Sequence, residues 1–298
     1  MEIALGDRSV TSSTTIDLMW SKAEELGLKD GLLHQTSRQV VTDIIKPVTR
    51  EDKCSFHEWV EKYRTDLTLQ PDYEYVRERN LTGSSEPSKV FVSHSWSGKF
   101  RDVMYLPQYL YGAPGTISDK ALWVDVFVVN HHNDLAKQLD QIEEAIKRCE
   151  RTVLILDEEW IALTRPWCVY ELGITLREKR PIDVAFGGPT RYCAVLDALV
   201  ILLGHGPDLD IVAKSVGDQH IVERIESSKV DVEMVKQAVR LALFEAARNE
   251  VTNKAHLPKD VEDKALNLIK EIGWQHVRNS GAERQRVIGI LAGHVHYS

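Results

Sequence analysis

The chain has 298 residues, of which 43% are hydrophobic and 28% are charged, and its formal net charge is −8 at pH 7. This length and balance are typical of one large or two ordinary globular domains with a sizeable core. The acidic balance gives no general attraction to phosphate polymers, so nucleic-acid binding is not expected, although a local basic pocket for a small phosphorylated ligand stays open.

The cysteines and the first residues favour the cytoplasm. The four cysteines are Cys54, Cys149, Cys168 and Cys193. They show neither CxxC pairing nor zinc-ligand spacing, and such sparse usage suits a reducing compartment. Residues 1–7 carry an early acid and no apolar run, so we expect no signal peptide. The most apolar run, 193–203, is too short to span a bilayer.

The composition and the periodicity of the sequence change along the chain. Residues 1–80 contain amphipathic runs such as 56–63 and are predicted to be helical. Residues 81–88 are rich in Gly, Ser and Pro and are predicted to be a linker. The next segment, 89–205, is predicted to be an α/β domain.

The remaining residues, 206–298, are predicted to be mainly helical. Helical periodicity is visible around 230–248, 260–276 and 282–295. The run 194–203 fits either a buried strand or a buried helix, because periodicity does not separate the two.

Short apolar runs alternate with helical patterns in the central region. The runs predicted to be strands are Lys89–Ser93, Trp123–Val129, Thr152–Leu156 and Pro181–Phe186. Helical patterns follow the first three, over 100–106 (where Pro107 interrupts), over 135–149 and from Pro166 onward. On the second of these helices, Glu143–Lys147 and Glu144–Arg148 are predicted to pair on the solvent side. Such alternation predicts a doubly wound parallel sheet flanked by helices.

Polar and aromatic residues crowd the ends of three predicted strands. They occupy 93–99 after the first strand, 130–134 after the second and 157–172 after the third. Ligands of open α/β sheets bind beyond the carboxyl ends of the strands. This edge of the sheet is therefore predicted to hold a pocket for an aromatic, phosphorylated ligand.

One helix beyond the third strand has a particular geometry. Trp167 and Glu171 are four residues apart and therefore lie on the same helical face. Pro166 favours a helix start just before them, where unpaired backbone N–H groups stabilise an ionised carboxylate. An aromatic plane beside a fixed anion is suited to a nucleotide base that carries positive charge.

Several segments resemble Toll/interleukin-1 receptor (TIR) domains. Val90-Phe91-Val92-Ser93 resembles their opening strand, and 123–130 resembles their second strand leading into the loop that follows it. Residues 142–146, followed by 152–156, resemble their I-E-x-A-I helix and third strand. Trp167-Cys168-Val169-Tyr170-Glu171-Leu172 is similar to their W-C-x-x-E-L motif. The match covers 89–190, about a third of the chain.

The resemblance implies a fold and two alternative functions. The fold is a flavodoxin-like doubly wound parallel sheet, here with helical N-terminal and C-terminal segments. One function is cleavage of the nicotinamide–ribose bond of NAD, with NAD as substrate and no bound cofactor, activated by self-association in immune or stress signalling. The other is a non-catalytic scaffold that acts by homotypic assembly.

The first function implies a set of site residues. Glu171 aligns with the catalytic glutamate of the family, and Trp96 and Trp167 are candidate stacking surfaces. Candidates for the diphosphate are Arg165, Lys99 and Arg101, and the remaining candidates for the pocket are Ser93, His94, Asn130, His131 and Cys168.

Plainer interpretations stay open for several of these residues. Glu171 could be a solvated first-turn glutamate, Trp167 a packing residue and Cys168 a small buried hydrophobe. A metal site is not expected, because the adjacent His131 and His132 cannot easily share one ion and no nearby ligands complete a set.

Overall fold

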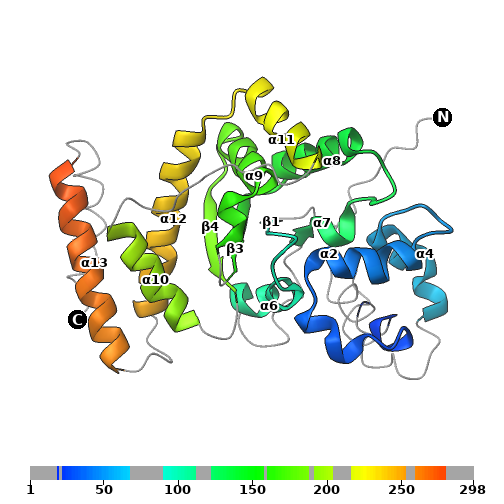
Figure 1. Cartoon of the computed structure of the whole chain (residues 1–298), viewed down its shortest axis with the longest axis horizontal. Coiled ribbons are helices and arrows are strands. Elements are labelled where there is room, and N and C mark those ends of the chain that lie inside the picture. The colour runs from blue at the N-terminus through cyan, green and yellow to red at the C-terminus, as the bar shows by residue number, and fades with distance from the viewer. Residues whose placement is uncertain are drawn as a thin grey trace. The chain divides into compact units, whose positions relative to one another are not determined.

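The structure, a computed structural model, describes residues 19, 22–67, 90–111, 122–157, 160–187, 191–203, 216–252 and 259–279 (Figure 1). The chain divides into two compact units. The first comprises 1–188 and 209–235, and the second comprises 189–208 and 236–298. The predicted linker at 81–88 and the predicted helix at 282–295 lie outside the described residues.

Four parallel strands form the sheet of the first unit. They are β1 (Val90–Ser93), β2 (Leu122–Val124), β3 (Arg151–Leu156) and β4 (Ile182–Phe186). Their order is β2-β1-β3-β4 and all neighbours pair in parallel. The predicted α/β class with a parallel sheet is confirmed. The order reverses between β1 and β3, so the topological switch point lies there.

Helices connect the strands and flank the sheet (Figure 1). They are α6 (Phe100–Tyr111), α8 (Leu135–Arg148) and α9 (Pro166–Arg177). The predicted start of α9 at Pro166 is confirmed. The predicted interruption at Pro107 is wrong, since α6 continues four residues beyond it to Tyr111.

The second strand is shorter than predicted. It ends at Val124, and Asp125–Val128 form the one-turn helix α7. The carboxylate of Asp125 accepts a hydrogen bond from the backbone N–H of Val126 at 2.7 Å, and Val129 N–H donates to Asp125 O at 2.9 Å. An aspartate that bonds its own local backbone competes with the strand ladder. The apolar residues that suggested a longer strand, including Phe127, are buried in this turn instead.

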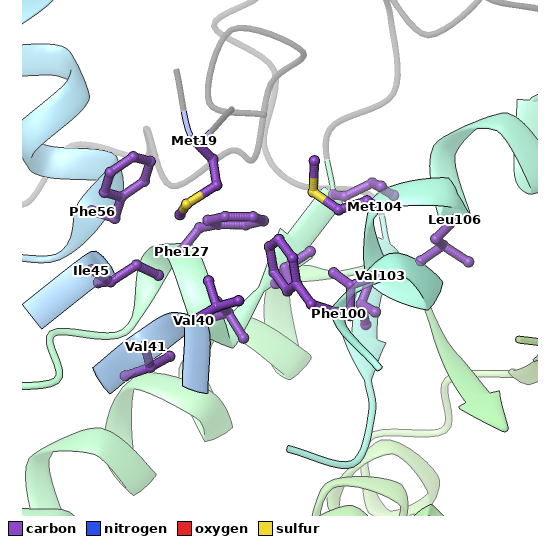
Figure 2. Packing of buried hydrophobic residues seen from close by; sticks show 14 of the residues in the cluster. Met19, Val40, Val41, Ile45, Phe56, Phe100, Val103, Met104, Leu106 and Phe127 are labelled. Atoms are coloured by element: carbon purple, nitrogen blue, oxygen red, sulfur yellow. The ribbon is translucent and has the colours of Figure 1, made fainter. Parts of the chain in front are cut away.

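The N-terminal helices pack into the same hydrophobic core as the sheet. They are η1 (Lys29–His34), α2 (Ser37–Val40), η2 (Val41–Ile45), α3 (Lys46–Val48) and α4 (Phe56–Leu67). Figure 2 shows Phe56 and Val40 together with Phe100 and Phe127. The ring of Phe127 lies 6.2 Å from that of Phe56 and 5.9 Å from that of Phe100, centroid to centroid. This shared core fixes the helical run 37–48 against the sheet.

A further helix, α11 (Val216–Ser227), lies in the region predicted to be mainly helical and packs on α9. Neither its bounds nor this contact was predicted. Arg224 donates to Glu143 Oε1 at 2.9 Å, and Arg177 donates to Glu143 Oε2 at 3.2 Å. Tyr170 also donates to Glu143. The predicted solvent-side pair of Glu143 with Lys147 is therefore wrong, because this carboxylate joins α8 to α9 and α11.

The second unit is helical. It contains α10 (Arg191–Leu203), most of α12 (Val232–Thr252) and α13 (Lys259–Asn279). The run 194–203 is therefore a helix and not a strand, and α10 packs against α13. The predicted helices around 230–248 and 260–276 are confirmed. Within the described part of the chain, no helix is long and apolar enough to cross a membrane.

The contact of Gly173 on α9 with Val230, which follows α11, predicts the effect of a small substitution. A Cβ added at Gly173 would overlap the side chain of Val230, only 3.1 Å from its Cβ. We expect Gly173→Ala to lower the free energy of unfolding by about 1–2 kcal/mol, because overpacking outweighs the gain in helix propensity. Chemical denaturation measures this change. Gly31→Ala is the control, since a Cβ at Gly31 meets nothing within 4 Å and should not destabilise. Equal effects of the two substitutions would contradict the prediction.

Candidate functional site

A pocket of about 310 Å³ lies at the carboxyl ends of the strands. Its walls come from the helical run 37–48, the loop after β1, α7, α8 and the start of α9. The lining residues are Arg38, Val41, Thr42, Lys46, His94, Ser95, Trp96, Asp125, Val129, Gln138, Ile142, Arg165, Trp167, Cys168 and Glu171. The predicted location of a pocket at this edge of the sheet agrees with the structure.

Glu171 lies in this wall and is only 4% exposed. The hydroxyl of Ser93, the last residue of β1, donates to Glu171 Oε2 at 2.6 Å. Burial raises the pKa of the Glu171 carboxyl well above its ordinary value, the negative charge of Asp125 raises it further, and the Ser93 hydrogen bond opposes both. The alternative that Glu171 is a solvated first-turn glutamate is therefore wrong.

The backbone that carries Glu171 is fastened to the sheet. Thr175 Oγ1 donates to the backbone carbonyl of Glu171 at 2.8 Å and lies 2.7 Å from Thr152 Oγ1 on β3. Both threonines are buried. These contacts fix the height of α9 over β3, and with it the position of the carboxylate.

The raised pKa predicts a stabilising substitution. The folded protein holds its proton on Glu171 to a higher pH than the unfolded chain, whose value is near 4.5. The folded state then binds more protons, so this group lowers stability as pH rises through and above 4.5. We expect Glu171→Gln to raise the melting temperature at pH 7.5 by a few degrees, since about 1 kcal/mol shifts it by roughly 2–4 °C.

A thermal melt series in pH checks this expectation. The gain should shrink as pH falls toward 4.5 and should level off below it, where both states of the wild type are protonated. A gain that is independent of pH would mean that charge burial is not its cause.

Asp125 is a second buried carboxylate in the pocket wall, 8% exposed. Its Oδ2 accepts a hydrogen bond from the indole N–H of Trp96 at 2.6 Å. Its Oδ1 lies 3.5 Å from His94 Nδ1. Burial lowers the pKa of His94 in spite of the Asp125 charge, so the imidazole is neutral at pH 7. Asp125 was not among the predicted site residues, because it lay within the predicted second strand.

Two tryptophans line the pocket, and both are half-buried. Trp96 is fixed by Asp125 and by the edge of the His131 ring, 5.2 Å away at 76°. His131 is buried behind Trp96 and its Nε2 lies 2.9 Å from Val126 O, so it supports the wall without lining the pocket. Trp167 is in the first turn of α9 and lines the pocket with Glu171.

Cys168 lines the pocket as a buried, protonated thiol. Its Sγ lies 3.4 Å from the backbone carbonyl of His94. Burial raises its pKa well above 9.0, and the neighbouring Glu171 raises it further. The reactive form of a cysteine is the thiolate. The geometry therefore fits the interpretation of Cys168 as a small buried hydrophobe.

Five predicted site residues do not line the pocket: Ser93 and His131, which are buried, and Lys99, Arg101 and Asn130, which contact other parts of the chain. Lys99 Nζ donates to His34 O at 3.0 Å, and Arg101 Nε lies 3.6 Å from Asp102 Oδ1. Asn130 Nδ2 donates to Lys53 O at 2.7 Å. The cations that do line it are Arg165, which is 8% exposed, and two residues of the N-terminal helical run that the sequence did not single out, Arg38 and Lys46.

No three His, Cys, Asp or Glu side chains within the described ranges are grouped so that they could hold a metal ion. The pocket instead combines two buried carboxyl groups, two tryptophans and three cations. This arrangement suits an organic ligand with a cationic, aromatic part and an anionic part.

Fold and pocket together define a parallel α/β protein with a pocket at the topological switch point of its sheet. Comparisons of the chain with protein-family models, with curated proteins and with solved structures find no match.

Proposed function

We propose that this chain is a TIR-like enzyme that cleaves the nicotinamide–ribose bond of NAD. The resemblance of 167–172 to the W-C-x-x-E-L motif supports the proposal. The strand order β2-β1-β3-β4 is also that of the first four strands of a flavodoxin-like sheet. The activity would be switched on by self-association in immune or stress signalling in the cytoplasm.

The observation that carries the proposal is a buried carboxyl group, Glu171, in the wall of a pocket lined by Trp96 and Trp167. In NAD the bond between ribose C1′ and the nicotinamide nitrogen breaks heterolytically. The electron pair stays on the ring nitrogen, so nicotinamide leaves as a neutral molecule. The positive charge that develops on the ribose is then met by the negative charge of Glu171.

The ribose cation then reacts with a nucleophile in one of two ways. Water can add to C1′ and lose a proton, which gives ADP-ribose. Alternatively, a nitrogen of the adenine adds to C1′ and gives a cyclic product. Neither route needs a bound cofactor, and each balances with nicotinamide as the leaving group.

The size of the pocket fits this reaction. Small-molecule pockets range from roughly 300 to 1,000 Å³, and this pocket has about 310 Å³. It can take the nicotinamide and its ribose, and the adenosine half would extend beyond it. A tryptophan face beside the ring favours the nicotinamide cation.

The raised pKa of Glu171 makes binding selective for a cation. In the empty pocket, burial and Asp125 favour the neutral carboxylic acid. A cationic ring beside it stabilises the carboxylate and releases the proton. A neutral ring does not stabilise the buried carboxylate of Glu171, so its binding lacks this favourable interaction.

Incubation of the purified chain with NAD tests the proposal. Nicotinamide release is followed by chromatography over a series of protein concentrations, including one at which the chain is assembled. We expect release that rises more steeply than linearly with protein concentration. Assembly without nicotinamide at any concentration would contradict the enzymatic proposal and would favour the scaffold function.

A further inference from the structure

We propose that the helical run 37–48 provides the phosphate-binding side of the pocket through Arg38 and Lys46. The inference rests on the proposed function for the identity of the substrate, a nicotinamide nucleotide. Its ligand chemistry, an organic phosphate, is carried by the structure of the pocket alone. It assigns to the N-terminal region a direct part in substrate selection.

Four residues of this run line the pocket, namely Arg38, Val41, Thr42 and Lys46. All but Val41 are spaced four residues apart. The run consists of α2, η2 and α3 without a break, and its middle turn, Val41–Ile45, is a π-helix. A π turn holds more residues than an α turn, so positions four apart align more closely along the helix. Single π turns within helices are often found at functional sites.

The run is held firmly against the residues that line the rest of the pocket. Arg38 N–H donates to Trp96 O at 3.0 Å, and Ser37 N–H donates to Gly98 O at 3.2 Å. Ser37 Oγ lies 3.2 Å from His94 Nε2. On its opposite face the run buries Val40 and Ile44 in the core. The two cations are therefore presented on a fixed helix and not on a loop.

The buried and the exposed charges of the pocket come from different elements. Glu171, Asp125 and the cation Arg165 are buried in its wall, whereas Arg38 and Lys46, from the helical run, are exposed. Within the described ranges no carboxylate forms an ion pair with either cation. In a chain of net charge −8, two such cations beside one pocket give a local attraction for an anion.

This arrangement matches the charge pattern of a nicotinamide nucleotide. The ring is cationic, and the phosphates follow on the far side of the ribose. With the ring beside Glu171, the phosphates would reach Arg38 and Lys46. The guanidinium offers two parallel hydrogen bonds to a phosphate, and the lysine acts as a point charge.

A substrate series tests the inference by the presence of phosphate. The double variant Arg38→Gln/Lys46→Gln is compared with Lys137→Gln/Lys147→Gln, which removes the same charge from exposed positions on α8. We expect KM for NAD and for nicotinamide mononucleotide to rise about tenfold in the first variant and to stay within twofold in the second. Turnover of nicotinamide riboside, which has no phosphate, should be the same in both variants and the wild type.

Two outcomes of this series would overturn the inference. One is an equal loss for all three substrates, which would indicate a general defect of the pocket. The other is no change in KM for the phosphorylated substrates. NADP serves as a further arm, because a preference for NADP over NAD that the first variant loses would place the 2′-phosphate, and not the diphosphate, at these cations.

Binding without catalysis separates this inference from the proposed function. Calorimetry with ADP-ribose and with adenosine gives the preference of the pocket for phosphate. We expect the wild type to prefer ADP-ribose, with an affinity that falls as NaCl is raised, and the first variant to lose most of this preference. If nicotinamide is never released but this result holds, only the reaction is wrong. Equal wild-type affinity for both ligands, or none for either, would refute the phosphate site.

Discussion

Glu171→Gln is expected to reduce nicotinamide release by about two to three orders of magnitude while the protein stays folded. Glutamine has the same shape as glutamate, and its carbonyl oxygen can still accept the hydrogen bond that Ser93 donates at 2.6 Å. What the substitution removes is the negative charge next to the ribose. A preorganised charge of this kind is worth roughly 3–4 kcal/mol in the transition state.

Single-turnover kinetics on NAD give the relevant rate, since product release does not contribute to it. Glu144→Gln on the exposed side of α8 is the matched control and should keep the wild-type rate. Calorimetry with NAD should show that the Glu171→Gln variant still binds it. A Glu171→Gln rate within threefold of the wild type would remove Glu171 from the mechanism.

The sheet could be predicted from the sequence because the pattern that marks each strand lies within a few consecutive residues. Each strand is a short apolar run, and burial on both faces of a parallel sheet leaves such a run uninterrupted. The predicted second strand was too long. The strand ends just before Asp125, whose Oδ1 accepts a hydrogen bond from Val126 N–H at 2.7 Å. In a β-branched run, that single polar residue was the only signal of the turn.

Glu171 was predicted as a site residue because a motif and a helix start coincide around it. Its burial was not predicted. Sequence spacing placed it in an opening turn, where a glutamate is usually solvated. The structure buries it because β1 and α9, distant in the sequence, come together at Ser93. Long-range packing of this kind leaves no periodic trace in the chain.

Two of the cations that line the pocket could not be predicted for the same reason. Lys99 and Arg101 follow β1 directly, which made them natural candidates for a phosphate. Their side chains instead contact His34 and Asp102. Arg38 and Lys46 belong to a region that the sequence separated from the α/β domain by a linker, and a shared core brings them to the pocket.

Asp125→Asn is expected to shift the acid limb of the pH profile of kcat/KM toward lower pH. The limb reports ionisation of Glu171 in the free enzyme, where the carboxylate is the active form. Burial is the larger cause of the raised pKa and the charge of Asp125 adds to it. Removing that charge lowers the pKa of Glu171, and burial still holds it above 4.5. The variant should therefore keep more of its maximal activity at acidic pH than the wild type.

A purely structural role of Asp125 would give a different result. Its two oxygens accept hydrogen bonds from Trp96 and from Val126, and asparagine has only one acceptor oxygen for the two donors. Lost positioning of Trp96 would lower the maximal rate and leave the midpoint of the acid limb unchanged. The pKa of His94 also falls without Asp125, so an acid limb set by His94 would shift in the same direction, and the pH profile alone does not distinguish the two groups. A ¹³C titration of the Glu171 carboxyl in both proteins would separate the two effects, and an unchanged midpoint there would show that the two carboxylates do not interact.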